Sequence, residues 1–333
     1  MINGIKPTMT KTTELRIKPT SFDEAMEGFC TKLEENCKPY VDSFKHMDSV
    51  TFRADGGNKY IKVKSFQVNI DTNYETGVKK LVGGLRGSIH CFVEKPLGSS
   101  SKQLSKLENL LKKKNKLITM MGYQLRFNPL IEYLNKVIKK KSPIGKLISA
   151  NIHHGENIKD FHPYEDYKIS YAANKKLGGG VILTQIHEID YFLHLFSDYK
   201  VTNTTYISSK VSELDIDVED IFSSNFLLKK NKNKMLCSIN LNYFERPKKR
   251  KFYLIGDNGS LVACFNTQKI HIFKNRKEKI LKFSFKKNDI FIKEIKFFIS
   301  KVKSKKPISK NLSLYNGIKT LRFALKLKDR FIK

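Results

Sequence analysis

The stretch H90-C-F-V-E-K-P-L-G98 places a carboxylate, an amine and a proline at the end of a short apolar run. The β-branched and aromatic residues before Glu94 predict a strand, and the lysine-rich segment after Gly98 predicts a helix. In open α/β sheets, ligands bind outside the carboxyl ends of the strands, so Glu94 and Lys95 are candidate site residues. A lysine there can hold a developing alkoxide. The ordinary alternative is a lysine that only caps the end of a strand.

A second group of reactive side chains follows a triple glycine, in G178-G-G-V-I-L-T-Q-I-H-E-I-D190. This glycine-led, apolar segment predicts a buried helix that starts near residue 180. Thr184, His187 and Asp190 are spaced three residues apart and share a helix face. An imidazole titrates near neutral pH and can move the proton of a hydroxyl group. The alternative is a histidine that is hydrogen-bonded within a domain interface.

Histidines and carboxylates also gather between residues 153 and 166, where a metal could be considered. The residues are His153, His154, His162, Glu156, Asp160, Glu165 and Asp166. Their spacing matches no zinc pattern, so no metal site is predicted. A loop rich in aromatic and charged residues is predicted over 156–176.

The elements that position these side chains change in type near residue 88. Before it, a helix over 22–36, a hairpin with strands 50–54 and 59–66, and a loop over 71–87 predict an atypical α+β segment. After it, strand 88–93, helix 101–115 and strand 117–122 predict a Rossmann-like βαβ half. We therefore expect three parts: 1–88, a remnant of a dinucleotide-binding domain over 89–145, and a C-terminal α+β domain over 146–333.

The C-terminal part is predicted to be a mainly antiparallel sheet with helices on one face. It follows a helix over 129–140 and includes the buried helix near residue 180. The predicted strands are 147–154, 201–209, 221–228, 235–244, 252–255, 261–265, 269–273 and 280–285, and the closing helices are 289–303 and 312–329. The basic run from Pro247 to Lys251 is assigned to the start of a strand, because F-Y-L-I follows directly.

Four motifs, taken in order and spacing, resemble the glucose-fructose oxidoreductase and inositol dehydrogenase (Gfo/Idh/MocA) family. They are Glu94-Lys95-Pro96, G122-Y-Q-L-R-F127, H162-P-Y-E-D-Y-K-I-S-Y-A-A173 and the triple-glycine segment to Asp190. The resemblance covers about residues 89–333. It implies an NAD(P)-dependent dehydrogenase of a sugar or sugar derivative, with a Rossmann domain and a C-terminal sheet that mediates homo-oligomers.

The same resemblance implies roles for individual residues. Lys95 and His187 would be catalytic, because the matching residues of the family lie beside the nicotinamide and the reacting hydroxyl. Glu94, Lys95 and Pro96 would contact the cofactor. The implied substrate residues are Arg126, His162, Tyr164, Thr184 and Asp190. Many relatives carry an aspartate at position 184, whereas this threonine brings no charge.

The cofactor fingerprint is missing. A dinucleotide site needs a strand, a G-x-G-x-x-G turn and a helix N-terminus, so that backbone N–H groups reach the pyrophosphate. The segment G83-G-L-R-G87 has the wrong spacing and leads into a strand. We therefore expect NAD or NADP binding, and with it turnover, to be impaired.

The composition leaves a second function open. The net charge is +31, most of it after residue 90, and a dense basic surface attracts phosphates. A non-catalytic binding or scaffold protein for nucleic acid or another polyanion is thus the alternative, although scattered lysines and the absence of tryptophan disfavour it. The five cysteines form no C-x-x-C pair. No apolar run approaches about 20 residues, which predicts a soluble, cytoplasmic protein.

Overall fold

The computed structural model describes residues 49–57, 60–69, 90–102, 104–140, 142–161, 166–328 and 331–332. The predicted helix over 22–36 and the predicted loop over 71–87 lie outside these residues. The chain divides into two compact units. The first combines the chain up to Tyr123 with Phe291–Leu321, and the second combines Gln124–Ile290 with the chain from Arg322.

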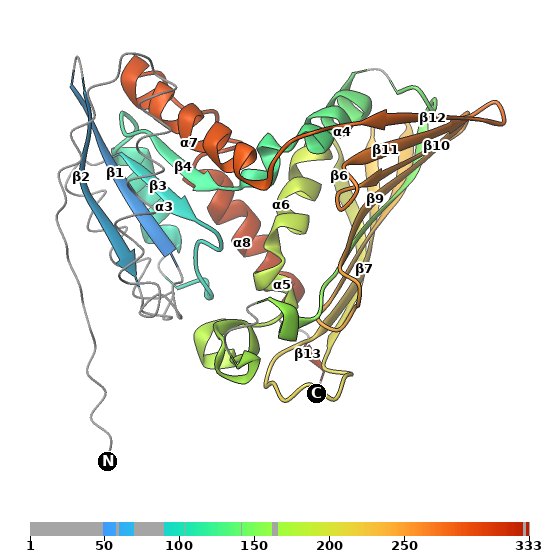
Figure 1. Cartoon of the computed structure of the whole chain (residues 1–333), viewed down its shortest axis with the longest axis horizontal. Helices are drawn as coiled ribbons and strands as arrows, with labels where there is room; N and C mark the ends of the chain where they lie inside the picture. The colour runs from blue at the N-terminus through green and yellow to red at the C-terminus, as the bar shows by residue number, and fades with distance from the viewer. Residues whose placement is uncertain are drawn as a thin grey trace. The chain divides into compact units, whose positions relative to one another are not determined.

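The first unit contains a four-stranded sheet in the order β2-β1-β3-β4 (Figure 1). Strands β3 (Cys91–Glu94) and β4 (Thr119–Gly122) are parallel and are joined by helix α3 (Leu104–Lys113). The helix forms because leucines recur at its buried face, at positions 104, 107 and 111. The βαβ unit predicted from the sequence is therefore present.

The N-terminal hairpin belongs to the same sheet. Strands β1 (Ser49–Gly57) and β2 (Tyr60–Asn69) pair antiparallel, and Phe52 of β1 pairs with Phe92 of β3. The sequence divides the chain at residue 88, but the strand that ends in Glu94 is hydrogen-bonded on both sides. It is a partner of the hairpin on one edge and of β4 on the other.

Part of the C-terminal region also belongs to the first unit. Helix α7 (Lys287–Ser304) places the Phe298 ring 5.7 Å from the Phe92 ring, and the Met121 N–H donates to the Leu312 carbonyl at 3.0 Å. Helix α8 (Leu314–Lys328) approaches closely at Gly317, where a Cβ would lie 2.5 Å from Met121 Sδ. The expected boundary at 145/146 differs from this division, because these apolar contacts join residues far apart in the sequence.

The second unit contains a nine-stranded mixed sheet in the order β12-β11-β10-β9-β5-β8-β7-β6-β13. Neighbouring strands are antiparallel except for the pairs β5 with β8 and β6 with β13. The mainly antiparallel sheet predicted from the sequence is thus observed. The strands are β5 (Leu147–Gly155), β6 (Lys200–Ser209), β7 (Ile221–Lys230), β8 (Asn233–Asn242), β9 (Lys249–Gly256), β10 (Gly259–Cys264), β11 (Lys269–Lys274), β12 (Lys277–Lys282) and β13 (Phe331–Ile332).

Helices α5 (Val181–Thr184) and α6 (Ile186–Leu195) lie on one face of this sheet, and α4 (Pro129–Lys139) lies beside α6 (Figure 1). Every second residue along β7 is buried beneath them, as the pleat requires. The Phe192 ring stacks on Phe226 with centroids 4.8 Å apart. The single helix predicted near residue 180 is interrupted at Gln185, whose Nε2 donates to the Asn242 carbonyl at 3.0 Å.

Short 3-10 helices occupy several connections. They are η2 (Gln124–Phe127), η3 (Ile158–Asp160), η4 (Tyr167–Ile169), η5 (Tyr171–Ala173) and η6 (Lys175–Leu177). Among the described residues, no helix combines the length and the apolar character that crossing a bilayer requires.

Candidate active site

The first group of candidate residues lies at the carboxyl end of β3, in the first unit. Glu94 is paired with Gly122 in the parallel ladder, and a Cβ on Gly122 would lie 2.8 Å from the Glu94 carboxyl carbon. The glycine therefore lets this carboxyl group pack against the backbone of β4. Burial raises the pKa of Glu94 to about 7, although the Lys95 ammonium and a Lys95 backbone hydrogen bond act in the opposite direction.

Lys95 and Pro96 follow directly. The peptide bond between them is cis, and Pro96 and Leu97 are buried whereas Lys95 is partly exposed. Leu97 contacts the region of Gly317 in α8, where a Cβ would lie 3.4 Å from Leu97 Cδ2. The corner is thus supported from behind by the packing of Leu97.

The triple glycine positions the second group, in the second unit. A Cβ on Gly179 would lie 2.4 Å from the Tyr171 carbonyl oxygen, and Gly180 has φ +107 with the Glu219 carboxylate where its Cβ would be. Glu219 also accepts two hydrogen bonds from Lys328 Nζ, at 2.7 and 2.8 Å, and its carbonyl accepts from Val181 N. The glycines are therefore required for close packing at the start of α5.

Thr184, a predicted substrate residue, stands where the family that the sequence resembles often carries an aspartate. It is 9% exposed, and its Oγ1 lies 2.7 Å from the hydroxyl of Tyr243, which follows β8. The Tyr243 hydroxyl also lies 3.3 Å from the Ala172 carbonyl. Burial raises the pKa of Tyr243 well above its ordinary value, so this group remains a hydrogen-bond donor at neutral pH. His187, one turn further along, is 5% exposed.

Asp190 and Arg126 form an ion pair with each other. Arg126 Nε donates to Asp190 Oδ2 at 2.6 Å and Nη2 donates to Oδ1 at 2.8 Å. Their side chains are 5% and 1% exposed, so this bidentate pair is almost completely withdrawn from water. Because Arg126 belongs to η2 and Asp190 to α6, the pair holds η2 against the helix that carries His187.

His194 lies one turn beyond Asp190 on the same helix. Its pKa is lowered to about 3, first because burial disfavours the imidazolium and then because the Arg126 and Lys139 cations oppose it. His194 is therefore neutral at pH 7 and takes no part in a charged network.

Glu188, which follows His187 in the sequence, is a buried carboxylate that contacts Arg250 and His154. Glu188 is 0% exposed, and its Oε1 lies 2.7 Å from Arg250 Nε in β9 and 3.2 Å from His154 Nδ1 in β5. Burial alone would raise the pKa of Glu188, but the Arg250 and His154 charges hold it well below its usual range. The Glu188 carboxylate therefore remains charged although it is buried, and it belongs to the same helix as His187.

The histidine and carboxylate stretch is divided by the pleat of β5. His154 is buried and contacts Glu188, whereas His153 Nε2 lies 2.6 Å from Glu245 Oε2 and is partly exposed. No group of three or more potential metal ligands occurs in the described part of the chain. His162 and Tyr164, two predicted substrate contacts, lie outside the described residues.

The sequence prediction did not single out Glu188, Arg250, Glu219, Lys328 or Tyr243. Glu188 carries a usable signal, since a carboxylate within an apolar buried helix requires a partner. No local pattern indicates that the partner is Arg250, which is 62 positions away within a lysine-rich run.

The described residues place polar groups at a strand end but form no cradle for a pyrophosphate. The Glu94, Lys95 and Pro96 corner offers polar groups at a strand end. However, the strand beside β3 is β1, which runs antiparallel and continues into β2. A strand, glycine turn and helix unit that would cradle a pyrophosphate is not present in the described residues.

No protein-family model matches this sequence, and no curated protein matches it. Several solved structures, however, are similar to this chain. Levoglucosan dehydrogenase in complex with NADH and levoglucosan is similar with a TM-score of 0.63 and 14% identity, over 75% of this chain and 74% of that one. A UDP-N-acetylglucosamine 3-dehydrogenase from Acidithiobacillus ferrooxidans is similar with a TM-score of 0.60 and 16% identity, over 77% of this chain and 75% of that one.

An oxidoreductase domain protein from Kribbella flavida is similar with a TM-score of 0.65 and 13% identity, over 77% of this chain and 75% of that one. At such identities the likeness concerns the fold. Over about three quarters of its length, this chain therefore shares the fold of oxidoreductases that include sugar dehydrogenases.

Proposed function

We propose that the chain is an NAD(P)-dependent oxidoreductase of the Gfo/Idh/MocA type that acts on a sugar or sugar derivative, with cofactor binding impaired. The observation that carries the proposal is the fold shared with levoglucosan dehydrogenase, a protein whose structure was solved with NADH and levoglucosan. The strand-end Lys95 and the buried His187 supply the residue types that such chemistry needs. The absence of a G-x-G-x-x-G turn from the sequence supports the proposed impairment.

The proton is handled by the chain's own residues. A bound NAD or NADP would supply the hydride chemistry. His187 accepts the proton of the substrate hydroxyl in the oxidative direction and returns it in the other, and Lys95 holds the oxygen. Thr184 and Tyr243 form an uncharged hydrogen-bonded pair where many relatives have a carboxylate. We therefore expect His187 to be a weaker base than its counterparts.

Arg126 and Asp190 are the proposed substrate residues that the geometry supports least. Both guanidinium nitrogens that face Asp190 are already used, and both Asp190 oxygens accept from them. Their role in the proposal is to hold α6, and with it His187, at a fixed depth. His162, Tyr164 and Thr184 remain the proposed substrate contacts.

The first experiment measures cofactor binding and turnover in the full chain. NADH and NADPH are titrated by fluorescence, and oxidation of a panel of sugars is followed at 340 nm, a wavelength at which the reduced nicotinamide absorbs. We expect weak but saturable binding of one cofactor. His187→Asn and Lys95→Met each lower kcat/KM by about 10²-fold or more, since positioned acid–base groups contribute 10²–10⁴. Lys106→Met, an exposed lysine of α3, is the control.

The enzyme proposal would be wrong if neither cofactor bound saturably while a random oligonucleotide bound with a steep salt dependence, which supports the scaffold alternative. Turnover that survives both substitutions unchanged would instead show that Lys95 and His187 are not the catalytic residues. If the double variant loses no more activity than the worse single variant, the two residues act on the same step.

We also propose that the outer face of the nine-stranded sheet associates with a second copy of this chain. Phe273, Ile255 and Leu236 lie in one row across β11, β9 and β8, linked through Ser260 and Ser149. They are 42%, 49% and 48% exposed, which is unusual for large apolar side chains.

Charge favours a second copy as the occupant. The central outward positions of β5 and β8 carry serine and asparagine, so two like-charged chains can meet there without apposing lysines. Two such sheets pack face to face at about −30°. Light scattering after size exclusion should give a dimer or larger, and Leu236→Lys should give a monomer. A monomeric parent chain would contradict this proposal.

A further inference from the structure

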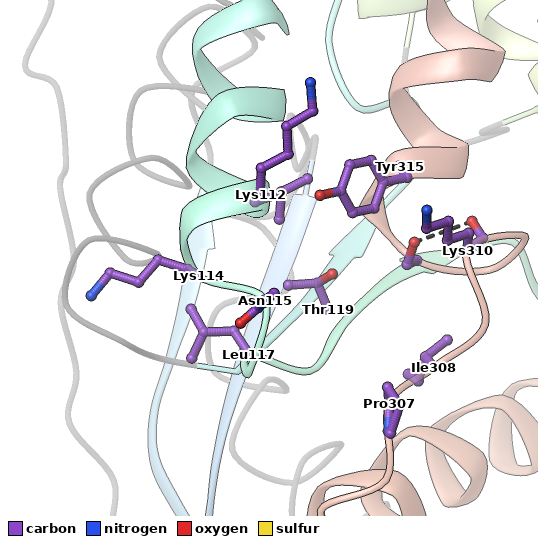
Figure 2. A pocket seen from close by; sticks show the side chains of 11 residues that line it. Lys112, Lys114, Asn115, Leu117, Thr119, Pro307, Ile308, Lys310 and Tyr315 are labelled. Atoms are coloured by element: carbon purple, nitrogen blue, oxygen red, sulfur yellow. Dashed lines mark hydrogen bonds between the residues drawn. The ribbon is translucent and has the colours of Figure 1, made fainter.

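A pocket lies in the first unit at the amino ends of the parallel strands. Its volume is about 370 Å³, within the range of small-molecule sites. Its walls come from the end of α3, the start of β4 and the segment that leads into α8 (Figure 2). All of its lining residues belong to this unit.

The pocket is distant from the Glu94 corner along the sheet. Thr119, which lines it, is the first residue of β4, whereas Glu94 and Gly122 are the last residues of β3 and β4. The pocket therefore lies at the opposite end of the strands from the proposed cofactor contacts. A ligand bound in it would be a different molecule from the proposed cofactor.

Lysines predominate in the segments that form the pocket walls, although the Glu108 carboxylate of α3 lies near Tyr315. The segments 111–119 and 305–315, which supply its walls, contain seven lysines and no aspartate or glutamate. Lys112, Lys114 and Lys310 line it directly. In Figure 2 the Lys112 and Lys114 ammonium groups extend outward from the rim, and Lys310 lies beside Tyr315. The flexible lysine stems can turn these charges toward a bound anion.

A buried hydroxyl group lies in the wall. Thr119 is 6% exposed, and within the described part of the chain its side chain makes no hydrogen bond. The neighbouring Ser313, by contrast, donates to the Lys310 carbonyl at 3.1 Å. Because Thr119 lines the pocket, its hydroxyl can donate a hydrogen bond to a ligand there.

The start of α8 and Tyr315 add further donors to the pocket wall. Helix α8 begins at Leu314, at the pocket wall, and its first N–H groups lie at the positive end of the helix dipole. Burial raises the pKa of Tyr315, and the nearby Glu108 charge adds to this, so the phenol stays protonated and can donate. A ligand that satisfies these groups must accept hydrogen bonds through several oxygens and carry negative charge.

We propose that this pocket binds the phosphate group of a small phosphorylated molecule, with Lys310, Lys112 and Thr119 as the groups that hold it. Phosphate presents several acceptor oxygens and two charges, which matches lysine and hydroxyl donors around a helix N-terminus. The inference does not depend on the proposed dehydrogenase activity.

The test uses the full chain and inorganic phosphate or pyrophosphate as probes. Calorimetric titrations are run at constant ionic strength, with chloride as the balancing anion. We expect saturable binding, weakened about three- to tenfold by Lys310→Gln and by Lys112→Gln. Thr119→Val removes the hydroxyl at nearly constant volume and should weaken binding about threefold or more. Lys106→Gln, on the same helix as Lys112 but outside the pocket, changes the net charge equally and should have no effect.

The outcomes separate a built site from a diffuse basic surface. If Lys106→Gln weakens binding as much as Lys310→Gln does, or if no saturable binding occurs, the proposal is wrong. A random oligonucleotide is titrated in parallel. If Lys106→Gln and Lys310→Gln weaken its binding equally, the basic surface binds polyanions without a defined site, and the proposal is wrong. Lys310 and Lys112 are exposed, so their variants should fold and the comparison stays informative even if Thr119→Val is unstable.

Discussion

Replacing Arg126 by leucine tests whether its pair with Asp190 supports the fold. The two side chains are 5% and 1% exposed and are joined at 2.6 and 2.8 Å. Removing one member of a buried pair leaves an uncompensated charge, which lowers the free energy of unfolding by about 3–5 kcal/mol. Arg126→Leu should therefore be destabilised by this amount, and Asp190→Leu likewise.

The double variant and an exposed pair provide the controls. Replacing both members with apolar residues is often close to neutral, so Arg126→Leu/Asp190→Leu should regain most of the loss. The Arg246–Asp160 pair has the same bidentate form, at 2.7 and 2.8 Å, but its side chains are 55% and 50% exposed. Arg246→Leu should therefore lower the free energy of unfolding much less than Arg126→Leu does, because water screens an exposed pair.

The assay is urea denaturation followed by circular dichroism, with the slope compared among variants to check that the same surface unfolds. The reasoning is refuted if Arg126→Leu stays within about 1 kcal/mol of the parent chain. In that case Arg126 would be free to serve as a substrate contact, as the family resemblance implies. Equal losses for Arg126→Leu and Arg246→Leu would also refute it, because burial would then make no difference.

Three further predictions concern the two groups of candidate residues. Because the folded pKa of Glu94 is about 7 rather than the ordinary 4.5, the folded state binds the extra proton between these values, so the free energy of unfolding falls as pH rises from about 4.5 to 7. Glu94→Gln should flatten this slope in urea titrations at several pH values; an unchanged slope would assign it to another group. Gly180→Ala should lower the free energy of unfolding by about 1–3 kcal/mol from backbone conformation alone, and by more because its Cβ meets the Glu219 carboxylate; thermal unfolding of the variant measures it, and a neutral result would contradict the packing. Tyr243→Phe removes the hydrogen bond to Thr184 and should cost about 1–2 kcal/mol, with a non-additive loss in the double variant with Thr184→Val; strictly additive losses would show that the two hydroxyls do not interact.

Local patterns were sufficient for most of the secondary structure. The leucines of α3 and the alternation along β7 depend on neighbours within a few positions, so the helix and the strand could be predicted from the sequence. The same is true of the strand that ends at Glu94. The interruption at Gln185 could not be predicted, because it depends on a hydrogen bond to the Asn242 carbonyl, 57 positions away.

The division into units was also beyond local patterns. Residues 291–321 read as the closing helices of the C-terminal domain, but Phe298 packs against Phe92 and Leu312 bonds to Met121. Apolar faces of helices are visible in a sequence, whereas the surface that covers each face is not. The assignment of these helices therefore required the structure.

The sequence by itself determined which side chains can do chemistry: the amine at the end of β3, the imidazole on a buried helix and the excess of lysine. It also determined that a G-x-G-x-x-G turn is missing. The tertiary structure alone decided which carboxylates are paired with cations. Asp190 contacts Arg126, which is 64 positions away in the sequence, and Glu188 of α6 contacts Arg250 of β9. The physical reason is that a carboxylate acquires its pKa and its role from the cations and the burial around it, and these come from distant parts of the chain.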